Sequence, residues 1–275
     1  MNDWALARQQ FLEEYKHIRH AEGRGSEDSN YYRALPFSDC TGRNSAMWAI
    51  RAQTYRYFEK NILKVLERRE GRPLRVLDLG AGNCWLCYRL SLRQHRPVAL
   101  DIFLDGRDGL GAARHYPVQF PAVEAEFDHL PFAAKAFDIV VFNASLHYSV
   151  DYVQTLSEAR RCLRAGGVIV VLDSPIYRRR EHGMRMVEEK RAHFLKKYGF
   201  ASDALPNMEF LDPTMLKNLA KDLAVRWQIL KPWYGWRWHL RPLNALLHKR
   251  RPPSRFWILI GRPTAYDHPA ASSID

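Results

Sequence analysis

A glycine-containing turn at residues 80–84 is the segment best suited to bind a small molecule. It follows an apolar run, and from residue 76 the segment reads Val-Leu-Asp-Leu-Gly-Ala-Gly-Asn-Cys. Glycine allows a tight backbone turn and lets a ligand come close where a Cβ would collide. Asp78 precedes Gly80 by two residues, and its carboxylate would repel a pyrophosphate. The segment therefore favours a ligand that carries positive charge over a dinucleotide.

Two further acidic residues follow the next two apolar runs. Asp101 could accept hydrogen bonds from both hydroxyls of a ribose. Glu126 could accept from an adenine amine, with Phe127 packed against the ring. Each acid alone is explained better by a capping or solvated role. Three acids at the carboxyl ends of three successive strands instead favour a nucleoside site, because ligands bind at that edge of an open α/β sheet.

Alternating strands and helices must position these residues. Apolar runs without polar alternation suit strands buried on both faces of a parallel sheet, and strand–helix alternation predicts a doubly wound α/β fold. A Pro- and Trp-rich segment joins the last two strands, so these could pair antiparallel at the sheet edge. The predicted strands are 75–79, 97–101, 118–123, 138–143, 168–172, 224–230 and 256–260.

The chain divides into three predicted parts. Residues 1–70 form a helical extension, with one helix capped by Asn2 or Asp3 and a second running from Asn44 or Ser45 to Gly71. Residues 71–265 form the α/β domain, and residues 266–275 form a flexible tail. The extension is either a lid over the binding site or a plain packing element.

Composition narrows the class of protein. The 275 residues carry a formal net charge of +12, which favours an anionic partner or reflects solubility alone. No apolar run approaches the ~18–20 residues of a membrane span, and the first residues do not read as a secretory signal. We therefore expect a cytoplasmic protein with reduced cysteines. Cys84 and Cys87 form a Cys-x-x-Cys pair without a second pair or a His cluster, so no metal site is predicted.

Several of these segments together resemble the type 11 methyltransferase family, a class I group that uses S-adenosylmethionine. The resemblance rests on segments 76–84, 99–101, 126–132, 137–140, 146–147 and 163–167, in this order. It implies a Rossmann-like seven-stranded sheet with the last strand antiparallel. Where the family usually has a third glycine, this chain has Cys84. The resemblance also implies S-adenosylmethionine contacts at Asp78, Gly80, Ala81, Gly82, Asp101, Ile102, Glu126, Phe127 and Asn143.

His147 is the candidate general base. Methyl transfer is an in-line displacement, in which an enzyme aligns two reactants and needs a base only when the acceptor must lose a proton. His147 follows the fourth strand, where it would lie beside the methyl group; alternatively it orients a loop or packs against the cofactor. Methylases of DNA-base amines carry Asn-Pro-Pro-Tyr or a relative there. This chain has Asn-Ala-Ser-Leu from residue 143, which argues against a DNA base.

A Trp- and Arg-rich insertion at 231–255 bears on the acceptor. No acidic residue occurs between Asp222 and Asp267. Aromatic residues among cations suit single-stranded RNA, an anionic lipid surface, or a hairpin whose tryptophans pack on the sheet edge. We predict a methyltransferase for an unidentified small-molecule or lipid-like acceptor. The alternatives are an RNA methyltransferase and a catalytically silent, methyltransferase-like binding module.

Overall fold

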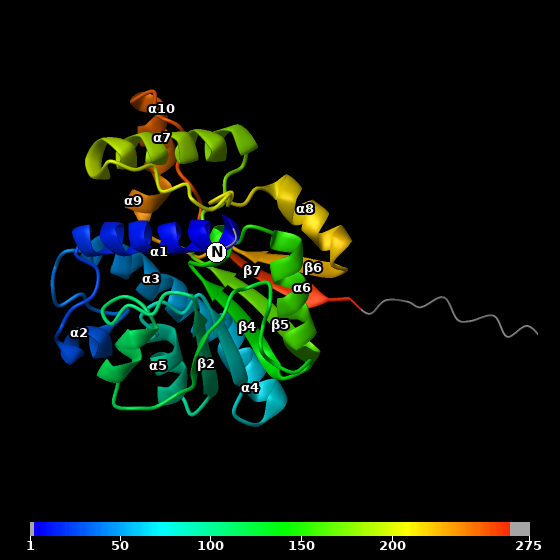
Figure 1. The fold of residues 1–275 in the computed structure, drawn as a ribbon. Helices are drawn as coiled ribbons and strands as arrows, with labels where there is room; N and C mark the ends of the chain where they lie inside the picture. The colour runs from blue at the N-terminus through cyan, green and yellow to red at the C-terminus, as the bar shows by residue number, and fades with distance from the viewer. Residues whose placement is uncertain (1–2, 265–275) are drawn as a thin grey trace, which may run out of the picture.

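A seven-stranded sheet forms the centre of the computed structural model, which describes residues 3–264. The strand order is β3-β2-β1-β4-β5-β7-β6, with helices on both faces (Figure 1), so the doubly wound α/β prediction is confirmed. The predictions for Asn2 and for the tail 266–275 lie outside the described residues. The strands are β1 (Arg75–Leu79), β2 (Arg96–Asp101), β3 (Ala122–Glu124), β4 (Phe137–Asn143), β5 (Leu163–Leu172), β6 (Val225–Leu230) and β7 (Ile258–Pro263).

The strand directions bring several chain turns to one edge. β1 to β5 pair in parallel, whereas β7 is antiparallel to both β5 and β6. The expected antiparallel last strand is therefore confirmed, although β7 lies between β5 and β6 rather than at the edge. In the register, Leu79 stands opposite Leu100 and Phe142. The segments that follow β1, β2 and β4 consequently begin side by side.

Three predicted strands differ clearly from the observed ones. The strand predicted at 168–172 already begins at Leu163. The strand predicted at 118–123 begins only at Ala122, because Pro121 has no N–H to donate to the ladder; its carbonyl instead accepts from Ala99. The strand predicted at 256–260 runs from Ile258 to Pro263. Its pairing continues because Gly261 leaves room for the Trp227 ring, which a Cβ would approach to 2.7 Å.

Each face of the sheet has its own apolar core, because side chains alternate along each strand. One core contains Val76, Val141 and Val170 from the strands, and the other contains Leu77, Val140 and Val171. The first is covered by α2 (Ser29–Ala34), α3 (Ser45–Phe58), α4 (Lys64–Glu70) and α5 (Trp85–Leu92), and the second by α6 (Tyr152–Cys162) and α8 (Pro213–Asp222).

The N-terminal region is helical, as expected. α1 (Asp3–Ala21) begins at the predicted Asp3. α3 continues through a π-helical turn at Glu59–Leu63 into α4, which ends at Gly71 with φ +62°. The short helix α2 was not predicted. Its capping residue Asp28 accepts a hydrogen bond from the Asn30 amide. A helix of six residues is too short to show a periodic pattern of apolar residues, so the sequence did not reveal it.

Four helices lie beyond the edge at which β1, β2 and β4 end: α1, α7 (Arg180–Tyr198), α9 (Trp236–His239) and α10 (Arg241–Leu247) (Figure 1). No described helix is long and apolar enough to cross a membrane. The insertion at 231–255 contains the two short helices α9 and α10 and is therefore not a plain hairpin.

A buried hydroxyl joins three of these regions. Thr54 of α3 is 1% exposed and donates to Asp173 Oδ1, just after β5, at 2.6 Å. The Thr54 oxygen also lies 2.9 Å from the Tyr234 hydroxyl of the insertion. The Tyr234 hydroxyl also lies 2.9 Å from the Phe256 carbonyl, so its single proton can go to that carbonyl or to the Thr54 oxygen.

We therefore expect Thr54→Val to lower the free energy of unfolding by about 1–3 kcal/mol, because the isosteric change leaves a buried carboxylate without its donor. Urea unfolding monitored by tryptophan fluorescence measures this. Thr54→Ser is the matched control and should lose less, since it keeps the hydroxyl. A valine variant more stable than the serine variant would contradict the importance of this bond.

Candidate active site

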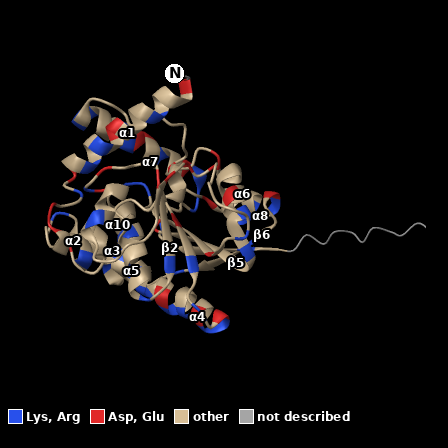
Figure 2. Ribbon diagram, turned by 60° about the horizontal axis from the view of Figure 1, so that its bottom comes forward, with Lys and Arg blue, Asp and Glu red and all other residues tan. Residues whose placement is uncertain are grey.

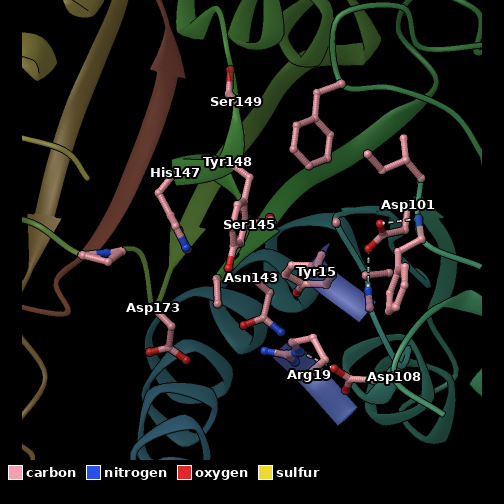
Figure 3. Close-up of a pocket in the computed structure, with 18 of the residues that line it drawn as sticks. Tyr15, Arg19, Asp101, Asp108, Asn143, Ser145, His147, Tyr148, Ser149 and Asp173 are labelled. Carbon is pink, nitrogen blue, oxygen red and sulfur yellow. Dashed lines mark hydrogen bonds and ion pairs between the residues drawn. The ribbon is translucent and has the colours of Figure 1, made fainter. Parts of the chain in front are cut away.

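A cavity of about 1220 Å³ opens at the carboxyl edge of the sheet. Its wall includes the glycine turn, the residues after β2, β4 and β5, and parts of α1, α3 and the insertion. In Figure 3, Asp101 lies on one side, His147 and Asp173 lie on the other, and Asn143 lies between them. The topology thus places most of the predicted site residues around one space.

The glycine turn is fixed from both sides. The amides of Gly80 and Ala81 donate to the Leu100 carbonyl at 2.8 and 3.0 Å, and the Ser145 hydroxyl donates to the Leu79 carbonyl. Gly80 has φ +74°, and a Cβ there would lie 2.3 Å from the Cβ of Ser145. Only glycine is compatible with this combination. Gly80, Ala81 and Gly82 all line the cavity.

Asp101 also lines the cavity and retains acceptor capacity. Its Oδ2 accepts from the Gly82 amide at 2.8 Å and its Oδ1 from the Phe103 amide at 3.0 Å. A carboxylate offers about four acceptor positions, so each oxygen can accept one more bond. Burial raises the pKa of Asp101. A pair of adjacent hydroxyls matches this arrangement, as the sequence predicted for a ribose.

The predicted adenine end is partly occupied by α1. Ile102, Glu126 and Phe127 line the cavity, but Glu126 Oε1 lies 3.0 Å from Arg8 Nε of α1 in an ion pair. The Phe127 ring lies edge-on to Phe142 at 5.9 Å. Glu126 is therefore already neutralised by a cation, which the sequence gave no means of foreseeing.

Asn143 provides a test of whether the cavity suits the expected cofactor. Its side chain lines the cavity and is only 8% exposed, and its Oδ1 is buried without a hydrogen-bond partner. A buried acceptor without a donor is uncommon in native proteins. An ammonium group such as that of a bound amino acid would satisfy it. Together with Asp101 and the bare turn at Gly80, the residues present match S-adenosylmethionine.

Asp78 lies behind the turn and is not among the described residues that line the cavity. Strand alternation turns it toward α5, where its Oδ2 lies 3.5 Å from Cys87 Sγ and its Oδ1 has no partner. Burial raises the pKa of Asp78 to about 7, and Asp101 adds to this. Asp78 therefore does not form part of the cavity wall, and the predicted direct contact with a ligand stays a prediction.

Cys84 has the left-handed φ of +64°, a conformation that glycine adopts without strain. Its side chain is fully buried, with Sγ 3.4 Å from the Gly82 carbonyl, and it is not among the described cavity-lining residues. The Cys84 side chain therefore does not protrude into the cavity. Burial raises the pKa of both Cys84 and Cys87, and no metal-binding group of His, Cys, Asp or Glu occurs within residues 3–264.

His147 lines the cavity, with Nδ1 3.3 Å from the Ser174 hydroxyl. Burial lowers the pKa of His147 to about 3, and the charges of Lys190 and Arg51 add to this. The imidazole is therefore neutral at physiological pH. It can accept a hydrogen bond, but it is a weak base, because the site disfavours its protonated form.

Two further charged residues line the cavity: Asp173, which was not predicted, and Arg51 of α3, which the sequence placed only in the possible lid. Asp173 follows β5 with φ +50°, and burial raises the pKa of this carboxyl to about 6, while Arg51 opposes the rise. Arg51 of α3 makes no ion pair within the part of the chain that the structure describes, and burial lowers its pKa. Asp173 could have been identified from the sequence, because it directly follows a strand, as Asp101 does. Nothing local to Arg51 could have placed it opposite β5.

α1 covers the cavity with one face. The residues that it contributes recur every three or four positions, as Trp4, Arg8, Phe11, Tyr15 and Arg19. Besides the Arg8–Glu126 pair, Arg19 forms an ion pair with Asp108. The rings of Tyr15 and Tyr148 pack edge-on at 5.8 Å. The helix thus bridges the segments that follow β2, β3 and β4.

Comparison with known proteins agrees with this geometry. Residues 77–171 match the family model described as a methyltransferase domain. A malonyl-[acyl-carrier protein] O-methyltransferase of Hahella chejuensis is 33% identical over 104 residues, which cover 37% of each chain. A demethylmenaquinone methyltransferase of Thermus thermophilus is 34% identical over 113 residues, which cover 38% of this chain and 50% of that protein. The matches thus span half or less of these curated relatives.

Solved structures share the fold. A chain from the complex between the Haloferax volcanii Trm112 methyltransferase activator and a methyltransferase superposes with a TM-score of 0.56 and 16% identity, covering 87% of this chain and 99% of that one. An S-adenosylmethionine-dependent methyltransferase from Mesorhizobium loti gives 0.50 and 16%, covering 69% and 90%. Residues 77–171 therefore match the methyltransferase-domain family, and the sheet order and these likenesses show that the chain has the fold of class I S-adenosylmethionine-dependent methyltransferases.

Proposed function

We propose that this protein transfers the methyl group of S-adenosylmethionine to a small-molecule or lipid-like acceptor. The observation that carries the proposal is the single cavity in which the bare turn at Gly80, the two-sided acceptor Asp101 and the unpartnered Asn143 meet. The bound cofactor supplies a methyl group on a positively charged sulfur. The protein's own part is to hold and align two ligands and to exclude water.

One end of the cavity would hold the cofactor. Asp101 would accept from the ribose hydroxyls and Asn143 Oδ1 from the ammonium group. Phe127 and Ile102 would flank the adenine. The charges of Asp78 and Asp101 would favour a cationic ligand, because burial strengthens their field. This assignment agrees with their raised pKa values, which reflect carboxylates without a compensating cation.

The other end would hold the acceptor. A cavity of 1220 Å³ exceeds the ~300–1,000 Å³ typical of one small-ligand site, so it has room for a second ligand. This end combines the polar groups of His147, Arg51 and Asp173 with an apolar wall. The apolar wall residues include Ile50, Pro175, Leu205, Trp238 and Phe256.

The acceptor end favours a substrate that needs little help from a base. His147 is neutral but weakly basic, so it would position the acceptor or accept a hydrogen bond from it. The Hahella relative is named for malonyl-[acyl-carrier protein] and the Thermus relative for demethylmenaquinone, and both names are compatible with a small-molecule or lipid-like acceptor. α1, held by ion pairs that include Arg8–Glu126 and Arg19–Asp108, would act as the lid that keeps water out.

Asp101→Asn should weaken S-adenosylmethionine binding about 10- to 100-fold, because a charge-assisted hydrogen bond is worth ~1.5–3 kcal/mol. Isothermal titration calorimetry measures this. Asp222→Asn is the matched control, since Asp222 is exposed at the end of α8 and outside the cavity, and it should bind as the wild type does. No saturable binding by the wild type at sub-millimolar concentration would refute the proposed function in favour of a silent binding module.

Asp78→Asn should change stability and cofactor binding in opposite directions. The raised pKa means that the stabilising effect of protonated Asp78 is lost as pH rises through about 7. The unliganded variant should therefore be more stable than the wild type at pH 8, by about 1 kcal/mol or more, and about equal to it near pH 4. Its cofactor affinity at pH 8 should fall severalfold, because a negative charge is lost. Urea unfolding at both pH values measures the stability difference, and calorimetry measures the affinity. If the variant and the wild type differed in stability by the same amount at pH 4 and pH 8, burial of a charged Asp78 would not be what lowers the stability of the wild type.

The His147 ring should remain neutral across the working pH range. Because its pKa is lowered to about 3, its ring proton signals in NMR should not move between pH 5 and 8. Free histidine, with a pKa of about 6.5, shifts over the same range. Comparison with His147→Gln assigns the signal. A midpoint near 6.5 for His147 would show that the cavity end is solvated and would restore it as a general base.

A further inference from the structure

A large apolar surface remains uncovered at the end of the molecule that holds the cavity. The insertion exposes two tryptophans and four leucines, which we call the apolar tip. α10 carries most of the leucines on one face, because spacings of three and four residues share a side of a helix, whereas its Ala245 is buried. The exposed fractions are Trp233 46%, Trp236 74%, Leu240 54%, Leu243 53%, Leu246 73% and Leu247 71%.

The inner side of the insertion is firmly anchored. The Trp238 ring packs against Phe256 at 5.3 Å, and the Arg241 guanidinium lies 3.2 Å from the centre of the Trp238 ring. Arg241 also donates to the Ser254 carbonyl at 2.6 Å. Trp238, Arg241 and Phe256 all line the cavity. The insertion therefore forms part of the cavity wall on one side and the apolar tip on the other.

The insertion itself carries only positive charges, although Glu189 of α7 forms an ion pair with its Arg251. Lys231, Arg237, Lys249 and Arg250 are exposed and form no ion pair within residues 3–264. No acidic residue occurs from 223 to 266. Elsewhere, as on α1 and α4, both signs occur together (Figure 2). An exposed apolar face with unpaired cations matches a partner that is apolar inside and anionic at its surface.

We propose that the α9–α10 insertion docks on a membrane surface that contains anionic lipid. The tryptophans and leucines of the tip enter the boundary between headgroups and acyl chains, while the four cations meet lipid phosphates. Single-stranded RNA would use the tryptophans and cations but would leave the leucines exposed to water. Because the insertion also lines the cavity, docking presents the cavity to an acceptor held in the bilayer, a conclusion that rests on the proposed function.

Vesicle co-sedimentation of the full chain tests this. The wild type should bind phosphatidylcholine vesicles that contain phosphatidylglycerol and bind pure phosphatidylcholine weakly. Leu246→Ser combined with Leu247→Ser should weaken binding about tenfold or more, because two apolar side chains no longer enter the bilayer. The matched control is Val65→Ser with Leu92→Ser, which alters residues 47% and 51% exposed on α4 and α5 at the opposite end (Figure 1). It should bind as the wild type does.

A charge-reversal variant and a second ligand complete the test. Lys249→Glu combined with Arg250→Glu should weaken binding to the phosphatidylglycerol-containing vesicles at least tenfold, so that they are no longer preferred over pure phosphatidylcholine. Thermal unfolding and S-adenosylmethionine titration of every variant should match the wild type. If the wild type bound the cofactor but did not bind the vesicles, the docking inference alone would be overturned. Vesicle binding without cofactor binding would instead overturn the proposed function.

Two other results would overturn the docking inference. In the first, the wild type and the leucine variant bind a single-stranded oligouridine, the charge variant does not, and none of them binds vesicles. This result would assign the insertion to RNA. Self-association that the leucine variant abolishes, again without vesicle binding, would assign the tip to a second copy of the chain.

Discussion

The site depends on one backbone turn that both neighbouring strands hold in place. The amides of Gly80 and Ala81 donate to the end of β2, and Ser145, just after β4, donates to the end of β1. The turn can therefore present bare backbone to a ligand without moving when the ligand binds. Preorganisation of this kind avoids the entropy cost of ordering a loop on binding. It also explains why the space above Gly80 admits no side chain, since a Cβ there would collide with Ser145.

Around this turn, the protein holds charges that it does not neutralise itself. Asp78 and Asp101 are buried without a cation, and Asn143 leaves a buried oxygen without a donor. Burying such groups lowers the stability of the unliganded protein. A ligand with positive charge and hydroxyl groups would recover that free energy on binding. The pattern is expected where a site is selected for affinity rather than for the stability of the empty fold.

The second half of the cavity is assembled from segments that the family core does not include. α1 covers the cavity through ion pairs to Glu126 and Asp108, α3 supplies Ile50 and Arg51, and the insertion supplies Trp238 and Arg241. The hydroxyls of Thr54 and Tyr234 lie 2.9 Å apart and bring two of these segments together. Choice of acceptor and attachment to a surface are therefore coupled in our proposal, because the same insertion serves both. The common core, in contrast, supplies the residues that we assign to cofactor binding.

The amino-acid sequence by itself determined the alternation of strands and helices, the glycine turn and the acids that end successive strands, because these depend on local periodicity and turn chemistry. The sequence also showed that Cys84 stands where a glycine is usual, but not that its φ is positive or that its thiol is buried. Only the tertiary structure decided that Asp78 lies behind the turn, that Arg8 neutralises Glu126, and that Thr54 meets Asp173 from 119 positions away. The physical reason is that the partners and the burial of a charged group depend on packing between distant segments. Periodicity along the chain carries no record of that packing.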